Sequence, residues 1–68
     1  MIDVTLLSGQ EISVNEDLIE TIEEIPDTVI KLSTGRKIIV KESRQKVKSL
    51  VKLYKWDIFN RFSDENNS

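Results

Sequence analysis

Three closely spaced glutamates, Glu20, Glu23 and Glu24, come nearest to a catalytic set in this chain. Two carboxylates at a suitable separation can hydrolyse a glycosidic bond, one as general acid and the other as base or nucleophile. A cleft that removes such a pair from water is hard to build from only 68 residues. We therefore interpret these glutamates as a solvated acidic strand face, and we do not expect the chain to be an enzyme.

Other catalytic and ligand-binding chemistry lacks its usual residues. The sequence has no His and no Cys, so it offers neither a nucleophile with an adjacent imidazole nor the preferred ligands of zinc. Its two glycines, Gly9 and Gly35, are isolated and form no phosphate-binding loop. No acidic loop has the spacing of a calcium-binding EF-hand. We expect no catalytic residues, no metal and no cofactor.

Charge is distributed unevenly along the chain, although the net charge is only −2. Residues 1–30 contain eight acidic and no basic residues, whereas residues 31–62 contain ten basic and two acidic residues. Acidic strands beside basic strands would neutralise one another across a sheet, and we favour this interpretation. Alternatively, the basic residues of the last strand and the helix meet an anionic partner.

Nucleic acid is one such anionic partner. The basic side chains that could follow a phosphate backbone are Lys37, Lys41, Arg44, Lys46, Lys48, Lys52 and Lys55. The expected strands contain no Phe, Tyr or Trp on which bases could stack. A solvated basic helix face is therefore the favoured interpretation, and nucleic-acid binding is not expected.

Five strands are expected to precede one helix. Apolar and polar residues alternate on both sides of Ser8-Gly9, which predicts a first hairpin, and Asn15-Glu16-Asp17 interrupts the alternation. Residues 18–25 have apolar side chains at helical spacing, but they lead directly into Pro26-Asp27, a good start for a turn. Their glutamates would also oppose the dipole at the end of a short helix. We therefore predict a strand here.

Thr34-Gly35 is the turn between the last two strands, because glycine tolerates the positive φ of tight hairpins. If Ile22 pairs with Leu32, Glu23 lies opposite Lys31, a favourable cross-strand pair. The expected fold is α+β: a five-stranded antiparallel β-meander, two-layered or partly closed, with one C-terminal α-helix packed on it.

The predicted helix follows Ser43, a suitable N-cap. Its apolar stripe is expected to cover the sheet and consists of Val47, Leu50, Val51, Tyr54, Ile58 and Phe62. Leu53, Trp56 and Phe59 do not lie on this stripe. Either the helix bends or ends near Lys55 and the aromatic residues return to the sheet, or they form a second apolar surface.

A second apolar surface would serve another subunit, another protein or a membrane interface, since Trp is a common anchor at interfaces. We therefore predict candidate partner contacts on the helix. They are Leu53, Trp56 and Phe59 as apolar anchors, with Lys48, Lys52 and Lys55 as a basic rim.

The length of the chain predicts a single domain, residues 1–62, followed by a frayed polar tail, residues 63–68. So small a domain buries about 60% of its unfolded surface, and this one has no disulfide or zinc site to stabilise it. Either regular hairpins suffice or subunits share a core, and we favour the homo-oligomer.

No apolar run approaches the roughly 20 residues that cross a bilayer, and the first residues lack a signal pattern. The absence of Cys is compatible with the cytoplasm. We expect a cytoplasmic protein that is not transmembrane, with peripheral contact to a membrane left open.

Several segments between Met1 and Tyr54 also carry a similarity to a known family. They are Leu7-Ser8-Gly9-Gln10, Asn15, residues 18–23, residues 26–32, residues 34–37 and residues 40–43. In this order and spacing the chain resembles the FlbD/SwrD family of small bacterial flagellar and swarming-motility proteins. It departs from the family at residues 44–46, where relatives often carry acidic residues.

The resemblance implies a cytoplasmic accessory factor that supports flagellar motor function or swarming through contact with a motor or motor-associated protein. It implies no enzyme and transfers no catalytic residue. The alternative is a small RNA-binding regulator of the carbon-storage-regulator type, which also combines about five strands with a terminal helix in a chain of similar length. RNA binding that weakens steeply with salt would distinguish the two.

Overall fold

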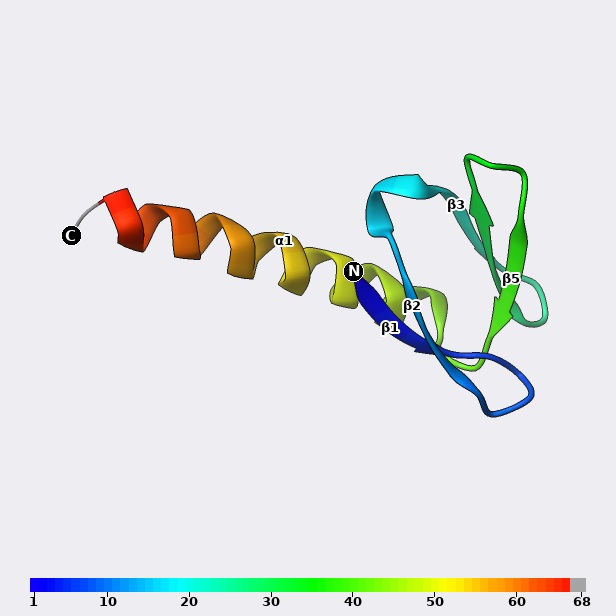
Figure 1. The fold of residues 1–68 in the computed structure, drawn as a ribbon. Helices are drawn as coiled ribbons and strands as arrows, with labels where there is room; N and C mark the ends of the chain where they lie inside the picture. Colours follow the sequence, from blue (N-terminus) through cyan, green and yellow to red (C-terminus); the bar gives the residue numbers. More distant parts are fainter. Residues whose placement is uncertain (67–68) are drawn as a thin grey trace.

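The fold consists of five short strands, one 3₁₀ turn and one long helix (Figure 1). The computed structural model describes the backbone of residues 1–66 and the side chains of residues 1–59. The elements are β1 (Ile2–Thr5), β2 (Glu11–Val14), η1 (Glu16–Leu18), β3 (Ile19–Glu24), β4 (Thr28–Leu32), β5 (Lys37–Val40) and α1 (Arg44–Asn66). The predicted α+β class, with five antiparallel strands and a C-terminal helix, is confirmed.

The strands form two sheets rather than the single meander that we expected. β1 pairs with β2, and β3, β4 and β5 form a second sheet in that order. An isolated bridge between Leu6 and Val40 joins them. Beside it, the Lys41 N–H donates to the Thr5 carbonyl at 2.8 Å and the Leu7 N–H to the Ile39 carbonyl at 3.3 Å. The first hairpin is therefore attached to the last strand and not to the third.

The turn η1 explains this separation. The side-chain oxygen of Asn15 accepts the Asp17 N–H at 3.0 Å, which ends β2 and starts a tight turn. The Ser33 N–H then donates to the Leu18 carbonyl at 2.7 Å and brings the chain beside β4. Residues 19–24 therefore pair with β4, and the predicted strand in this segment is confirmed.

The register between β3 and β4 differs from the expected one. Ile22 lies opposite Ile30 and Glu23 opposite Val29, so the predicted pairing of Ile22 with Leu32 is wrong. The hairpin loop decides this, because the Ile25 N–H donates to the Asp27 carbonyl at 3.2 Å across Pro26. Residues 24 and 28 are thereby the last pair before the loop.

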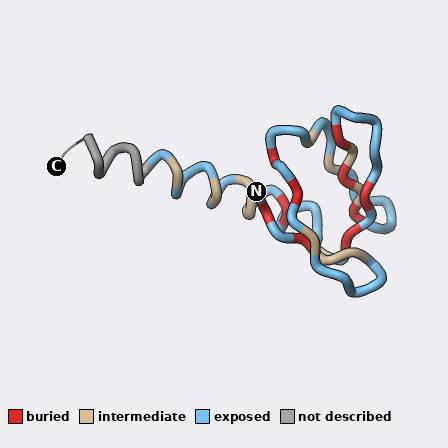
Figure 2. The backbone as a smooth tube through the Cα atoms, viewed as in Figure 1, coloured by how far each residue is buried: buried red, intermediate tan, exposed pale blue. Residues whose placement is uncertain are grey.

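The core lies between the two sheets and the first turns of α1 (Figure 2). Its buried side chains are Ile2, Val4, Val14, Ile30, Leu32, Ile38, Val40 and Val47. Alternate strand residues point inward, as the burial of Ile38 and Val40 beside exposed Lys37 and Ile39 shows. Val47 is the helix residue that completes this core.

The predicted N-cap of α1 is confirmed. The hydroxyl oxygen of Ser43 accepts the Lys46 N–H at 3.1 Å, and its carbonyl accepts the Val47 N–H at 3.0 Å. The helix continues to Asn66, so the alternative in which it ends near Lys55 does not hold. The side chain of Phe62 and residues 67–68 lie outside the described part, and the frayed tail stays a prediction.

Candidate protein-interaction surface

Helix α1 has a buried side near its start and exposed apolar side chains further along. Val47 is fully buried, and Leu50, Val51 and Tyr54 pack against the core as half-buried residues. Leu53, Trp56 and Phe59 are 62%, 64% and 69% exposed. We call these three residues the apolar patch. The structure thus decides between the two interpretations of Trp56 and Phe59: they do not return to the sheet.

The apolar patch is one continuous feature of the helix surface. Its members are spaced by three residues, so each side chain is a neighbour of the next. The second half of α1 extends away from the strands (Figure 1), and its described residues are half-buried or exposed (Figure 2). The sheets of this chain therefore do not cover the patch.

The predicted basic rim forms a row beside the patch. Lys48, Lys52 and Lys55 are spaced by four and three residues, which places them on one side of the helix. We call them the lysine row. They line one groove of about 300 Å³, together with Glu16, Ile19, Ile22 and Val51. Because Ile19 and Ile22 belong to β3, this groove runs between the helix and the sheet.

A second hollow lies on the other side of the lysine row. Lys52 lines it together with Leu53 and Trp56, and its volume is about 450 Å³. Lys52 therefore borders both hollows. The structure brings together the members of the predicted site in this way, except that Phe59 lines neither hollow.

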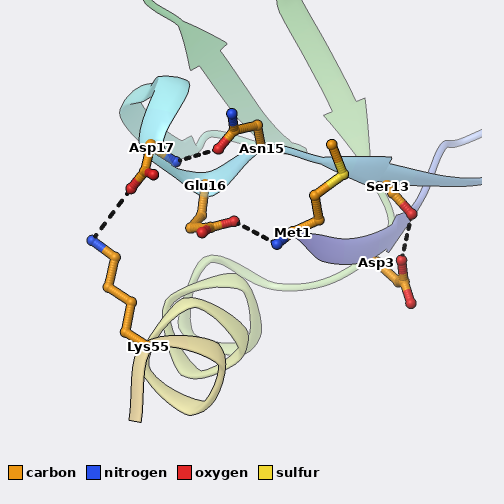
Figure 3. Close-up of polar contacts among 7 residues, drawn as sticks. All are labelled: Met1, Asp3, Ser13, Asn15, Glu16, Asp17 and Lys55. Carbon is orange, nitrogen blue, oxygen red and sulfur yellow. Dashed lines mark hydrogen bonds and ion pairs between the residues drawn. The ribbon is translucent and has the colours of Figure 1, made fainter. Parts of the chain in front are cut away.

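Polar contacts join turn η1 to the helix and to the N-terminus of the chain (Figure 3). Lys55 Nζ lies 4.0 Å from Asp17 Oδ1, and the terminal amine of Met1 lies 2.9 Å from Glu16 Oε2. Burial alone would raise the pKa of the Glu16 carboxyl, but the hydrogen bond and charge of the ammonium lower it below the usual 4.5. Burial opposes charge on the amine too, yet hydrogen bonds with Tyr54 and Glu16 raise its pKa above 8.0.

Two further carboxylates fix the start of α1. Glu24 Oε1 accepts the Arg44 N–H at 2.6 Å, which satisfies one free amide of the first turn. Both carboxylate oxygens of Glu42 accept the Thr5 N–H, at 2.8 and 3.1 Å. Burial would raise the Glu42 pKa, but these hydrogen bonds prevail and lower it below 4.5. Sequence patterns gave no sign of these roles, since the residues read as ordinary surface acids.

The three glutamates that suggested hydrolytic chemistry have separate surroundings. Glu20 Oε1 lies 3.8 Å from Lys31 Nζ, Glu23 lies on the outer face of the sheet beside Lys31 and Lys37, and Glu24 caps the helix. Among the residues that the structure describes, no cluster of acidic side chains could hold a metal ion. No described helix is long and apolar enough to cross a membrane.

Comparison with known proteins identifies the family of the chain. The family model FlbD, described as flagellar and swarming motility proteins, matches residues 1–59. The chain belongs to the FlbD family. No curated protein matches it, and no solved structure matches it. The resemblance found in the sequence is thereby confirmed, and membership of the FlbD family supports a role in flagellar or swarming motility.

The FlbD match includes the whole candidate surface. It covers all five strands and α1 as far as Phe59, so the apolar patch and the lysine row lie within the family region. In this FlbD protein the exposed apolar side chains therefore belong to the family domain itself and not to an added segment.

Proposed function

We propose that this FlbD protein is a non-enzymatic accessory factor that supports flagellar motor function or swarming by binding another protein through α1. Its partner is a protein of the motor, or one associated with it, contacted from the cytoplasm at the inner face of the membrane. The observation that carries the proposal is the exposure of the apolar patch, at 62% to 69% for each of its three side chains.

Exposure of three neighbouring large apolar side chains is unfavourable in water. Aromatic side chains bury about 150–250 Å² each when they are covered, and exposed contiguous patches mark interaction sites. Trp is among the residues that most often dominate binding energy at protein interfaces. The patch also has a cationic border, the lysine row, which suits the polar rim of an interface.

Motility of a strain that carries altered copies of the gene tests this proposal. We expect Trp56→Ala with Phe59→Ala to abolish or strongly reduce swarming while the protein stays folded and normally abundant. The matched control is Leu7→Ala with Ile39→Ala, which truncates two side chains outside α1, in the β1–β2 loop and in β5, that are 48% and 45% exposed. Normal swarming of the first variant, or equal loss in both, would contradict the proposed surface.

The RNA-binding alternative has its own measurement. Purified protein would bind RNA with an affinity that falls steeply as salt rises, because phosphate contacts release counterions. Such binding, with swarming unaffected by the loss of the patch, would favour a regulator over a protein-contact factor. Sedimentation of the same samples gives the oligomeric state, for which the homo-oligomer remains our prediction.

A further inference from the structure

The lysine row divides two apolar hollows, and this arrangement specifies the chemistry of what binds there. We propose that the partner presents an amphipathic helix with acidic residues spaced by four along one row and apolar residues on both sides of it. The acidic row lies on Lys48, Lys52 and Lys55, and the apolar flanks fill the two hollows. This inference rests on the proposed function and extends it to the partner's surface.

The geometry of α1 gives the required spacing. From Lys48 to Lys55 the row spans seven residues, which is about 10.5 Å along the helix axis. A partner helix lying along α1 repeats the same spacing, since its residues three and four apart also share one side. On one flank its apolar side chains meet Ile19, Ile22 and Val51. On the other they meet Leu53 and Trp56.

The charges of the free chain favour an acidic occupant. Within the described residues, Lys48 and Lys52 have no carboxylate at ion-pair distance, and Lys55 has only Asp17, at 4.0 Å between two exposed side chains. Cations four residues apart on a helix repel each other. An acidic row would turn this repulsion into attraction along the ridge between the two hollows.

Other occupants fit this surface less well. An extended peptide would have to pair with the edge of β3, which carries Glu20 and Glu23 and an irregular register between Ile19 and Thr21, features that protect strand edges. A second copy would bring its own lysine row against this one. A flat lipid surface cannot enter the groove between β3 and α1, and its aliphatic floor offers no stacking partner to RNA.

Selection from a displayed library of helical peptides with randomised surface positions tests the proposal on the full chain. We expect selected peptides to carry Asp or Glu at positions i and i+4, with Leu, Ile, Met or Phe on both flanks. Their binding should weaken as salt rises and should change the amide signals of Ile19, Ile22 and residues 48–56. Lys48→Glu with Lys52→Glu should weaken binding by about tenfold or more, because the row becomes acidic.

The matched control is Lys37→Glu with Lys41→Glu, which makes the same charge change on and after β5 and should leave peptide binding unchanged. Selected peptides without acidic enrichment, or affinities equal in the two charge-reversal variants, would overturn the proposal. So would a shift of the fluorescence of Trp56, the only tryptophan, with vesicles of anionic phosphatidylglycerol but not with peptides. If swarming still requires Trp56 and Phe59 in that case, the proposed function stands and only the acidic partner helix is wrong.

Discussion

Several carboxylates of this protein accept backbone amides rather than cationic side chains. Glu42 accepts the Thr5 N–H with both oxygens, Glu24 accepts the Arg44 N–H, and Asn15 makes a similar contact in η1. Each contact joins the end of one element to the start of another. The core formed by the described side chains has only eight buried apolar residues, so such contacts help to define how the elements meet.

Glu42→Gln tests the contact in which two carboxylate oxygens accept one amide. The amide of glutamine keeps the shape and one acceptor oxygen but loses the charge, and hydrogen bonds to charged groups stabilise more than neutral ones. We expect the free energy of unfolding to fall by about 1 kcal/mol in urea denaturation at neutral pH. The control is Glu23→Gln, since Glu23 is exposed; an equal loss in both variants would contradict the role of Glu42.

The lowered pKa of Glu42 also predicts how the stability difference between wild type and Glu42→Gln depends on pH. A carboxyl whose pKa is lower in the folded state contributes stability that is present above its unfolded value, here 4.5, and that is lost as pH falls through the folded value. The difference between wild type and Glu42→Gln should therefore be constant near neutral pH and shrink below pH 4.5. Urea denaturation from pH 3 to 7 measures it, and a difference that grows on acidification would contradict the assignment.

At the scale of elements, the sequence determined what each segment becomes but not how the segments pair. Alternation and turn residues predicted the strands, and the cap and spacing predicted the helix. The register of β3 on β4 was missed because a shift of two residues leaves every side chain on the same face of the sheet. Only the backbone of the loop from Ile25 to Asp27 distinguishes the two registers.

The joining of the two sheets could not be predicted for a related reason. The bridge from Leu6 to Val40 connects residues far apart in the chain and depends on backbone groups that every residue has. The candidate surface was more accessible to prediction, because helical spacing alone separates Leu53 and Trp56 from Val47. The groove between β3 and α1 could not be predicted, since the contribution of Ile19 and Ile22 depends on how β3 lies beside α1.

Two substitutions in α1 test the division of the helix into a packed and an exposed side. Val47→Ala removes two methyl groups from a site with 0% exposure, and we expect it to cost roughly 2 kcal/mol of unfolding free energy. Leu53→Ala removes more atoms from a site that is 62% exposed, and it should cost less than about 0.5 kcal/mol. Thermal or urea unfolding of both proteins checks the order, and a larger cost for Leu53 would show that it is packed in the free chain.

At the scale of the whole molecule, the packed body and the projecting helix form an elongated particle of 46 × 22 × 19 Å. Acidic residues dominate the strands up to β4, and basic residues dominate the sequence from Lys31 to Phe62. The pair of Glu20 with Lys31 lies between neighbouring strands and agrees with the expected neutralisation across a sheet, whereas the pair of Asp17 with Lys55 joins η1 to α1. Among the described residues, Lys48 and Lys52 have no carboxylate at ion-pair distance, so their charge is available to a partner.

The first turns of α1, which pack on the core, should be more stable than its projecting part. Most of the stability of a helix in a protein comes from tertiary packing, and α1 packs on the core through Val47, Leu50, Val51 and Tyr54. In native-state hydrogen exchange we therefore expect amides of β4, β5 and residues 47–54 to open only with global unfolding. Amides of residues 56–59 should open at a free energy lower by at least about 2 kcal/mol.

A bound partner changes this expectation in a definite direction. A helix that covers the lysine row and the apolar patch adds contacts to residues 48–56, so protection of residues 56–59 should rise towards that of the core while β4 and β5 change little. Exchange of the protein with and without a saturating selected acidic peptide measures the difference. Equal protection along α1 as far as Phe59 in the free protein would mean that the projecting part is already stable without a partner. That result would contradict the expected stabilisation by a bound helix.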